Sequence, residues 1–429
     1  MRRPGVWVLS LFVAATAATA VAQDEVPCVV EVDSVRELER VIDHYRRADL
    51  GSCNVLLIRL APGDYHLTPS AAVDSSCGNC EDPDQRIPIT VGLEISGPSV
   101  TIEGPVDDEA VIHTHAGYGI FFRNCGYGKL SNLTITGGER DTAQAATDAA
   151  VVAQNAQVEI VDCIIRDNIG DARLIEKNIV GIMGVCGREN SRLYIRNNDI
   201  TRNSWDGIAL YRDAFAVIER NYIDGVDKAG GREAGGGRGV GIGVTWNARA
   251  TIEKNAVRRY WKGIGIFVDA VAEVRANFVE EMRAWGIAYW DAGKGRPRAL
   301  ITENVIYDCG ACGISVSREA PFAPDEEPSR ISKNIVVNTA HNPKYDAPDY
   351  YCYQCAMALH AVPEGMIIRK NVFHDNRTVD EDRFNKDTTR DIFWRKRRHL
   401  QRKYRNTKIG VRGSHTFHDT SYLKRYGRM

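Results

Sequence analysis

Aromatic side chains recur at one repeated position of this sequence, where they could bind a ligand. Gly-Ile pairs recur along the chain, and each opens a short segment in which apolar residues alternate with other types. In an extended segment of this kind the apolar residues point inward and the residues between them face solvent. The second outward position of successive copies holds Tyr211, Thr245, Phe267, Trp290, Ser317 and His360. Four further tryptophans flank this row, namely Trp205, Trp246, Trp261 and Trp285.

An aromatic row of this kind is typical of a surface that binds an extended glycan. The C–H faces of sugar rings stack on aromatic rings. The first outward position holds small residues such as Ala209 and Gly243, which would form a shallow floor. The alternative, that the aromatic rings pack beneath inserted loops, stays open from sequence alone. The predicted substrate-binding residues are Tyr211, Phe267, Trp290, Trp246 and Trp285.

Charged side chains border the same groove and have the types needed for catalysis. Removing the proton alpha to a uronic acid carboxylate requires a cation that neutralises the carboxylate and a base that takes the proton. Lys262 and Arg212 are candidate cations, and Tyr211 and His360 are candidate acid–base groups. Hydrolysis would instead require two carboxylates. The predicted catalytic residues are Lys262, Arg212, His360, Asp206 and Asp291.

Two other groups of polar residues favour structural interpretations. Asp213, Asn247 and Asp269 occupy the same repeat position, which favours capping of turns by their side chains over catalysis. His113 and His115 alternate along one segment and are expected to face outward together, and a surface pair is favoured over a metal site. The sequence contains no contiguous motif of a calcium-binding loop. A calcium site assembled from separate coils nevertheless stays open.

Four cysteines near the end of the repeats form two Cys-x-x-Cys pairs at equivalent positions of neighbouring repeats. Stacked strands lie about 4.8 Å apart, within the range of a disulfide. We therefore predict the disulfides Cys309–Cys352 and Cys312–Cys355. A tetrahedral zinc site made by the same four cysteines is the minority alternative. Further candidate disulfides among the 11 cysteines are Cys28–Cys53 and Cys77–Cys80.

The fold that positions these residues must be built from a repeated sequence motif, apolar-x-x-Asn-x-apolar. Its seven copies are centred on Asn198, Asn221, Asn255, Asn277, Asn304, Asn334 and Asn371. Two earlier copies keep the apolar frame with Leu133 and Cys163 at the central position. Equivalent residues of stacked coils lie directly above one another, so each inward Asn can bond the next. We therefore predict that the Asn residues form a structural ladder.

The spacing of the repeats predicts an all-β fold. Each unit contains short apolar runs of period two separated by Gly and Asx turns, with no helical segment between them. Such units are best stacked as a right-handed parallel β-helix. We expect a signal peptide over 1–22, a segment with a capping helix at 34–48 within 23–53, the β-helix over 54–376, and a basic C-terminal extension over 377–429.

The repeats, together with the segment Leu60-Ala61-Pro62-Gly63-Asp64-Tyr65, resemble the pectin-lyase-like family of right-handed parallel β-helix proteins. This resemblance covers about 54–376 and implies a fold shared by polysaccharide lyases, epimerases and hydrolases. Neither the paired aspartates of the polygalacturonase branch nor the Asp-Pro-His-Asp of alginate epimerases is present. The resemblance therefore implies action on a polysaccharide without specifying the reaction.

Composition and the N-terminus predict an exported globular protein. The chain is 44% hydrophobic and 26% charged, which excludes disordered, collagenous and coiled-coil classes. Arg2 and Arg3 precede an apolar run that is too short to span a membrane, and Ala20-Val21-Ala22 is typical of a cleavage site. We expect a periplasmic or extracellular location and no transmembrane segment. Residues 395–429 hold 12 lysines and arginines against one acid.

The sequence thus predicts a protein that binds an acidic polysaccharide along one sheet, and the family resemblance adds lyase or epimerase activity as the candidate reaction. No nucleic-acid partner is expected. The alternative from a different class is a non-catalytic periplasmic or surface scaffold for binding or assembly. Its basic C-terminal extension would engage the partner.

Overall fold

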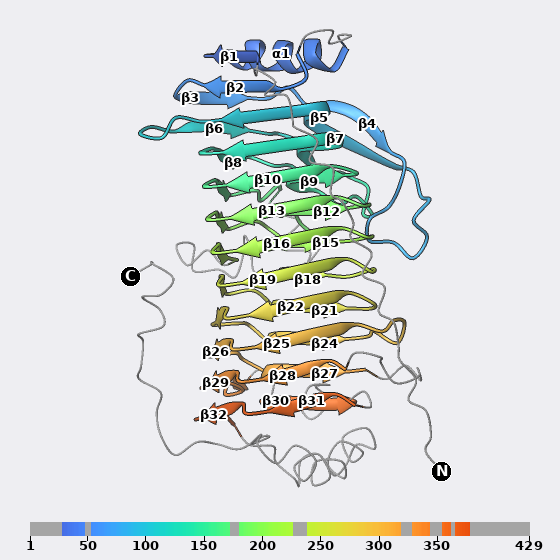
Figure 1. The fold of residues 1–429 in the computed structure, drawn as a ribbon, viewed down its shortest axis with the longest axis vertical. Helices are drawn as coiled ribbons and strands as arrows, with labels where there is room; N and C mark the ends of the chain where they lie inside the picture. The colour runs from blue at the N-terminus through green and yellow to red at the C-terminus, as the bar shows by residue number, and fades with distance from the viewer. Residues whose placement is uncertain are drawn as a thin grey trace, which may run out of the picture.

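The computed structural model describes residues 28–47, 53–171, 180–225, 238–318, 328–343, 354–361 and 365–377. Its strands stack in parallel along one axis, as predicted for a β-helix (Figure 1). Within these ranges they form one sheet of 21 strands and one of 11 strands. Most coils contribute three strands, and each face of the solenoid is formed by strands from equivalent positions.

The first strand of each repeating coil belongs to a face that we call the pocket face. Its strands are β9 (Ala149–Gln154), β12 (Met183–Arg188), β15 (Ile208–Leu210), β18 (Val240–Val244), β21 (Lys262–Phe267), β24 (Trp285–Trp290), β27 (Cys312–Ser317) and β30 (Cys355–Ala361). Their register aligns the Gly-Ile pairs, with Ile242 opposite Ile264 and Ile264 opposite Ile287. These isoleucines are fully buried in the core.

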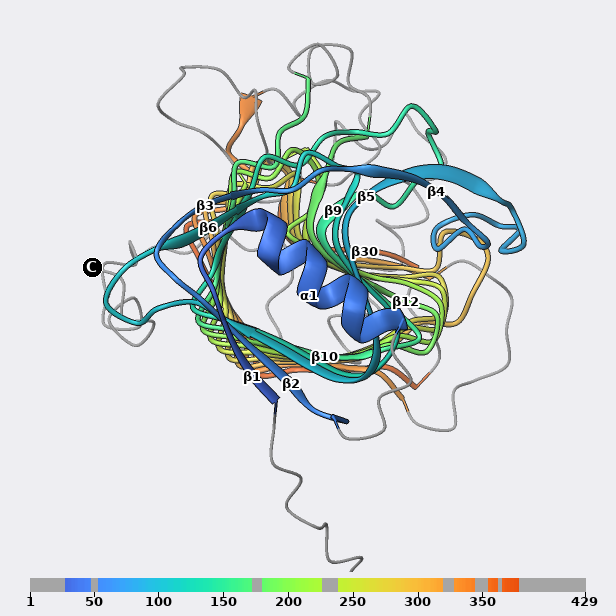
Figure 2. The ribbon, with the colours of Figure 1, turned by 90° about the horizontal axis from the view of Figure 1, so that it is seen from above.

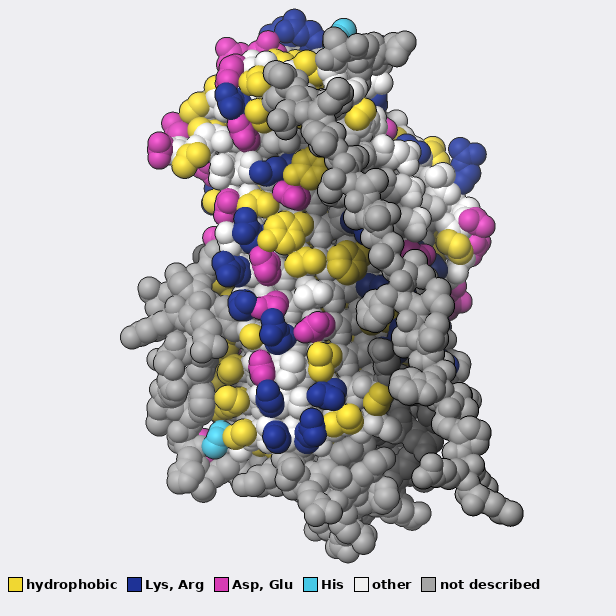
Figure 3. Space-filling model, in the orientation of Figure 1, with side chains coloured by type: hydrophobic (Ala, Val, Ile, Leu, Met, Phe, Trp, Pro, Cys, Tyr) yellow, Lys and Arg dark blue, Asp and Glu magenta, His cyan; other side chains and the backbone are white. Residues whose placement is uncertain are grey.

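The second strand of each coil forms the face that we call the charged face. Its strands are β10 (Gln157–Val161), β13 (Arg192–Arg196), β16 (Phe215–Glu219), β19 (Arg249–Glu253), β22 (Val271–Arg275), β25 (Arg298–Thr302), β28 (Arg330–Ser332) and β31 (Ile367–Arg369). Basic and acidic side chains lie next to one another across this face (Figure 3). Arg275 is paired with Glu253 of the preceding coil at 2.6 Å.

The third strands form the separate 11-stranded sheet. They are β3 (Gly63–His66), β6 (Ala110–His113), β8 (Thr134–Thr136), β11 (Ile164–Arg166), β14 (Asp199–Thr201), β17 (Tyr222–Asp224), β20 (Ala256–Arg258), β23 (Phe278–Glu280), β26 (Val305–Tyr307), β29 (Ile335–Val337) and β32 (Val372–His374). The turn between the second and third strands carries the predicted Asn residues.

The Asn ladder is confirmed. Asn221 Nδ2 donates to Asn255 Oδ1 at 2.9 Å, and Asn255 Nδ2 donates to Asn277 Oδ1 at 3.0 Å. The same bond continues from Asn277 to Asn304. At the start of the series, the Cys163 N–H donates to Asn198 Oδ1, so Cys163 occupies the ladder position as predicted. Each buried amide thereby finds partners within the stack, and the ladder fixes the coil register.

A second buried ladder, which we did not predict, follows the third strands. Asn168 Nδ2 donates to Asn203 Oδ1 at 2.8 Å, and Asn168 Oδ1 accepts the Gly138 N–H. Near the other end Thr339 bonds Asn376 in the same way. Amide side chains therefore support two corners of the coil.

The N-terminal end is covered by helix α1 (Val35–Arg47), in agreement with the helix expected at 34–48. The helix lies across the end of the solenoid (Figure 2). Leu38, Ile42 and Tyr45 are buried beneath it, and Tyr45 Oη donates to the Ser99 carbonyl at 2.8 Å. Strand β1 (Cys28–Val32) precedes this helix in the sequence, and β2 (Leu56–Leu60) follows it. The two strands pair in parallel.

An arm formed by β4 (Ser70–Asp74) and the first part of β5 (Ile87–Glu103) extends beyond the regular coils (Figure 2). The two strands are antiparallel, and β5 continues into the parallel stack against β7 (Tyr118–Ser131). The arm packs on the outside of the pocket face through an apolar cluster. Members of this cluster include Ile87, Ile89, Val91, Tyr118, Phe121, Val152, Met183, Cys186, Ala209 and Tyr211.

A buried ion pair attaches the arm. Arg188 Nη1 lies 2.7 Å from Asp74 Oδ2 and also donates to Tyr118 Oη and Thr147 Oγ1. Both members of the ion pair are almost fully buried. Because a buried charge is tolerated only with partners, this network specifies where the arm sits.

Parts of the prediction lie outside the described residues, namely the signal peptide at 1–22 and all but the first residue of the extension at 377–429. In the described ranges, no helix has the length and apolar character needed to cross a bilayer.

Candidate functional site

A pocket of about 360 Å³ opens on the pocket face over strands β15, β18 and β21. Trp205, Trp246 and Trp261 form its walls, and Ala209 and Gly243 form its floor. Its volume falls within the range of about 300–1,000 Å³ that is usual for ligand sites. The predicted combination of aromatic walls over a flat floor is therefore present at this position.

Small residues on the floor make room for the pocket. Ala209, Gly243 and Gly265 are register partners on three successive strands. A Cβ atom at Gly243 would meet only the Val240 side chain, whereas one at Gly265 would overlap the ring of Phe267. Phe267 thus lies across Gly265 and closes one end of the floor. Gly243 leaves the middle of the floor open.

Asp206 is the one carboxylate that lines the pocket among the described residues. Its carboxyl group is buried and accepts the Val240 N–H at 2.5 Å. A Cβ atom on Gly239 would lie 2.0 Å from Asp206 Oδ1, so glycine is required there. Burial raises the pKa of Asp206 to about 7, against smaller lowering effects of the Val240 N–H and the Lys262 ammonium. Such a group can take up or release a proton near neutral pH.

Lys262 lies among tryptophan rings on the same pocket. Its Nζ is 4.3 Å from the centroid of Trp261, 5.4 Å from that of Trp285 and 5.5 Å from that of Trp290. Burial lowers the pKa of Lys262, and the Asp206 carboxylate opposes this effect. Cation–π attraction to three rings holds the ammonium in place, and no described residue forms an ion pair with it.

Arg238 adds a second cation, and only part of its hydrogen-bonding capacity is used by the described residues. Its Nη2 donates to the Ser204 carbonyl at 3.3 Å, and its guanidinium lies 5.3 Å from the ring centroid of Trp205. Its Nε and Nη1 atoms are buried and have no partner among the described residues. Burial and the Arg283 charge lower the pKa of Arg238. Buried guanidinium donors are normally satisfied, so these atoms indicate a site for an acceptor.

The arm closes one side of the pocket. Asn79 Oδ1 accepts the Trp246 indole N–H at 3.0 Å, and Lys294 pairs with Glu81. Arg212 lies 4.6 Å from the centroid of the Trp246 ring. Trp246 is therefore held between the arm and Arg212, which does not itself line the pocket. The loop of the arm thus contributes to a site on coils far from it in the sequence.

The structure brings together half of the predicted site residues. The residues from the prediction that line the pocket are Asp206, Lys262, Tyr211, Trp246 and Phe267. Trp285 and Trp290 pack in a T-shaped pair behind Lys262, with ring centroids 5.0 Å apart. Trp285 is fully buried. These two rings thus support Lys262, and the alternative that some aromatic rings are packed rather than exposed applies to Trp285.

The other predicted residues have different surroundings. Asp291 is buried outside the pocket lining and accepts the Gly293 N–H at 2.9 Å, which is a turn contact. The side chain of His360 lies outside the described residues. Tyr211 lies under the arm with its hydroxyl 3.8 Å from Met183 Sδ. Burial raises the pKa of Tyr211 well above its ordinary value, so the expectation that Tyr211 could act as a base is not supported.

The repeated position of Asp213, Asn247 and Asp269 makes structural contacts between coils, whereas the expected capping of each residue's own turn is not among the contacts of the described residues. Asn247 Nδ2 donates to Asp213 Oδ1 at 2.6 Å, and the Asn247 backbone N–H donates to Asp269 Oδ1 at 2.7 Å. The three side chains therefore link turns of successive coils. Arg238, in contrast, was missed because it follows a glycine-rich insertion in which the repeat spacing fails.

The structure tests part of the predicted cysteine pairing. The candidate disulfides Cys28–Cys53 and Cys77–Cys80 are present. Cys312 and Cys355 are buried register partners on β27 and β30, but no disulfide joins their sulfurs, so the predicted Cys312–Cys355 bond is not formed in the structure. Cys352 lies outside the described residues, so the Cys309–Cys352 pairing and the zinc alternative stay predictions.

Comparison with known proteins supports the architecture. Residues 175–379 match the family model described as "Right handed beta helix region", which confirms the predicted hand and the family resemblance over that region. No curated relative matches the sequence. The chain is similar to a tailspike protein of Escherichia coli bacteriophage HK620, at 12% identity and a TM-score of 0.51, over 81% of this chain and 59% of that chain.

Two enzymes have the same architecture. An alginate lyase from Paenibacillus sp. str. FPU-7 is 14% identical over 71% of this chain and 94% of that chain, with a TM-score of 0.44. The A-module of a mannuronan C-5 epimerase from Azotobacter vinelandii is 12% identical over 80% and 95%, with a TM-score of 0.45. No property of this chain is inferred from these two enzymes.

Proposed function

We propose that this chain, whose residues 175–379 belong to the right-handed β-helix proteins, binds an acidic polysaccharide in the pocket beside Asp206, Lys262 and Arg238 and acts on it by proton transfer. The fold alone does not specify this function, because β-helices carry many activities. The observation that carries the proposal is that the buried Arg238 and the half-buried Lys262 have no carboxylate bonded to them in the described part of the pocket.

The walls favour a sugar as the ligand. Trp205, Trp246 and Trp261 present indole surfaces around a floor of small residues. Indole rings stack on the C–H faces of sugars, and the indole N–H of Trp246 is already used by Asn79, which fixes the ring. A rigid aromatic wall binds at a low cost in side-chain entropy.

The charges favour an acidic sugar. Three cations, Arg238, Lys262 and Lys294, line the pocket against the single acid Asp206, and Lys294 is already paired with Glu81. A carboxylate or sulfate group on the ligand would supply acceptors for the Nε and Nη1 atoms of Arg238. Charge-assisted bonds of this kind are among the stronger hydrogen bonds in proteins.

A proton-transfer reaction follows from the protonation behaviour of Asp206. In a β-elimination the unprotonated Asp206 would take the proton alpha to the sugar carboxylate while Lys262 and Arg238 neutralise the developing charge. The electron pair of the broken C–H bond forms a C=C bond as the glycosidic C–O bond breaks, and the leaving oxygen takes up a proton. Epimerisation differs only in the last step, in which the carbon is reprotonated on its opposite face.

Binding is tested by tryptophan fluorescence and calorimetry with uronic-acid polysaccharides and with neutral glucans. We expect tighter binding of the acidic polymers, and a loss of roughly 10- to 100-fold for Arg238→Ala, since a hydrogen bond to a charged group contributes about 1.5–3 kcal/mol. Arg275→Ala on the charged face is the matched control and should bind like the wild type. Equal binding by Arg238→Ala and the wild type would contradict the site.

Turnover is tested separately by the ultraviolet absorbance of unsaturated sugar ends. Asp206→Asn should retain binding while its rate falls by about 10²-fold or more. Binding without any absorbance change or epimerised product would favour the non-catalytic scaffold instead.

We also propose that the protein works in an oxidising compartment outside the cytosol. The disulfides Cys28–Cys53 and Cys77–Cys80 support this location, because such bonds persist mainly in exported proteins. Export predicts a mature N-terminus at Gln23, which N-terminal sequencing of the secreted or periplasmic protein would check.

A further inference from the structure

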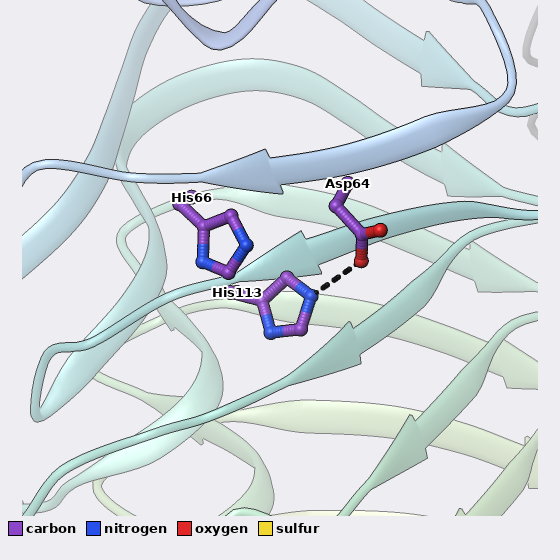
Figure 4. Close-up of side chains that lie close together, drawn as sticks. All are labelled: Asp64, His66 and His113. Atoms are coloured by element: carbon purple, nitrogen blue, oxygen red, sulfur yellow. Dashed lines mark hydrogen bonds and ion pairs between the residues drawn. The ribbon is translucent and has the colours of Figure 1, made fainter.

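Three ligand-type side chains project together from the first coils of the 11-stranded sheet (Figure 4). Asp64 and His66 lie on β3, and His113 lies on β6, where it is the register partner of His66. The residues between them, such as Tyr65, point into the core and are buried. The strand pairing therefore places one carboxylate and two imidazoles on the same outward surface.

The distances bring their polar atoms close to one another. His113 Nε2 lies 2.7 Å from Asp64 Oδ1, and the rings of His66 and His113 are stacked with centroids 4.1 Å apart. One ligand atom from each of the three residues lies within 4.8 Å of the other two. Small rotations of exposed side chains would place all three atoms around one ion.

His115 supports this group from the following turn. It adopts a left-handed backbone conformation, with φ of 51°, and its Nε2 lies 3.1 Å from His66 Nδ1. Its own Nδ1 lies 4.0 Å from Glu139 Oε1. Since Nδ1 of His66 is used by His115, Nε2 of His66 is the nitrogen left for a ligand. A hydrogen bond to the second ring nitrogen is a usual feature of metal-binding histidines.

We infer that Asp64, His66 and His113 bind a divalent transition-metal ion, with His115 positioning His66. Two imidazoles and a carboxylate suit Zn²⁺, Cu²⁺ or Ni²⁺, whereas Ca²⁺ and Mg²⁺ prefer oxygen ligands alone. The side chains are open to solvent, with Asp64 64% exposed, so water can complete the coordination.

A purely structural role does not account for the cluster. Exposed ion pairs and ring contacts contribute little to stability, and the core beneath is already closed by Tyr65 and Ile112. Of the histidines in this cluster, only His113 and His115 stand close together in the sequence, which favours a surface pair. His66 and Asp64 join them only through the pairing of β3 with β6.

The site lies on a different sheet from the pocket. The pocket occupies β15, β18 and β21, whereas the histidine cluster lies near the N-terminal end of the 11-stranded sheet (Figure 1). Metal binding is therefore independent of the proposed function, and either can fail without the other.

The test is calorimetric titration of the purified untagged protein with Zn²⁺, followed by Cu²⁺ and Ni²⁺. We expect one ion per chain, and a melting temperature that rises with metal concentration because only the folded state has the site. His66→Ala and His113→Ala should each weaken binding by at least about 10- to 100-fold, and His115→Ala by up to a similar factor. His113→Gln is a second, more conservative substitution, and we expect the same loss of metal affinity from it.

His341→Ala is the matched control, since His341 is also exposed but lies beside Asp375 at the other end of the solenoid. It should bind metal like the wild type. Failure of all three ions to bind the wild type would overturn the proposal. Binding that is unchanged in both His66→Ala and His113→Ala would also overturn it.

Discussion

The pocket face and the charged face are built from the same coils, yet their polar side chains behave in opposite ways. Asp206, before β15, is buried, and its pKa is raised to about 7. Glu253, at the end of β19, has its pKa lowered by hydrogen bonds from Lys254 and Arg275. Both are outward-facing acids of a repeat. What differs is the covering, because the arm packs over the pocket face, whereas no such arm lies over the charged face in the part of the chain that the structure describes.

The comparison indicates that chemistry in this molecule comes from departures from the repeat. The repeat alone yields rows of paired surface charges, which are screened by solvent and contribute little. The non-repeating arm converts equivalent positions into a low-dielectric pocket in which charges interact strongly.

Breaking the buried pair that attaches the arm should have the largest effect. In Asp74→Ala the buried Arg188 guanidinium loses Asp74 and keeps Glu189, whose side chain is 18% exposed, as its carboxylate partner. We expect a loss of about 3 kcal/mol in the free energy of unfolding, at the lower end of the usual cost of removing one partner of a buried ion pair, because Glu189 still compensates part of the charge. Urea denaturation measures this loss. A change below about 1 kcal/mol would mean that the arm is not held by this pair.

The buried carboxyl group of the pocket should make stability depend on pH. Below about pH 4 Asp206 is protonated in both folded and unfolded chains, so it has no effect. As pH rises from about 4 to about 7, the unfolded chain loses this proton while the folded chain keeps it, and stability falls. Above about pH 7 the destabilisation is complete, at no more than about 4 kcal/mol.

Asp206→Asn should remove this pH dependence while keeping an acceptor for the Val240 N–H. The variant should therefore be more stable than the wild type near pH 8, and the difference should vanish near pH 4. Asp213→Asn on an exposed turn is the matched control. Parallel stability curves for Asp206→Asn and the wild type, measured by urea denaturation across this range, would refute the assigned pKa.

Removing one wall of the pocket should have a moderate effect on ligand binding. Trp246→Ala removes a ring held by Asn79 and Arg212, and stacking of such a ring contributes about 0.5–1.5 kcal/mol beyond its buried area. We expect affinity for an acidic polysaccharide to fall roughly 3- to 10-fold or more. Titration by calorimetry, with the exposed Phe215→Ala of the charged face as control, measures the change. Equal losses in the two variants would remove the distinction between the faces.

Sequence periodicity predicted those parts of the molecule that repeat. Asn255 and Asn277 stack as expected because equivalent positions of a solenoid must lie above one another. Helix α1 also matched its expected range, because its capping signal and apolar face are local features. Asp206 and Lys262 were correctly named as groove residues for the same reason, since each precedes a Gly-Ile segment.

Features that depend on non-repeating segments could not be predicted in this way. Asp74 and Arg188 are 114 residues apart in the sequence, and no local pattern links them. Arg238 follows an insertion that breaks the repeat spacing, so the sequence did not show which stacked position this residue would occupy. His66 is the last residue of β3, which precedes the first copy of the repeated motif. Its register with His113 became visible only through the pairing of β3 with β6.

The smallest effect is expected for the ion pairs of the charged face. Glu253→Ala removes the partner of Arg275, whose side chain is 45% exposed, so solvent replaces the lost contact. We expect the free energy of unfolding to change by less than about 1 kcal/mol and the change to shrink further in high salt. Urea denaturation at low and high salt measures both quantities, with Asp74→Ala as the reference for a covered pair. A salt-independent loss as large as that of Asp74→Ala would show that covering by the arm is not what separates the two faces. The repeat itself would then be the source of strong electrostatics.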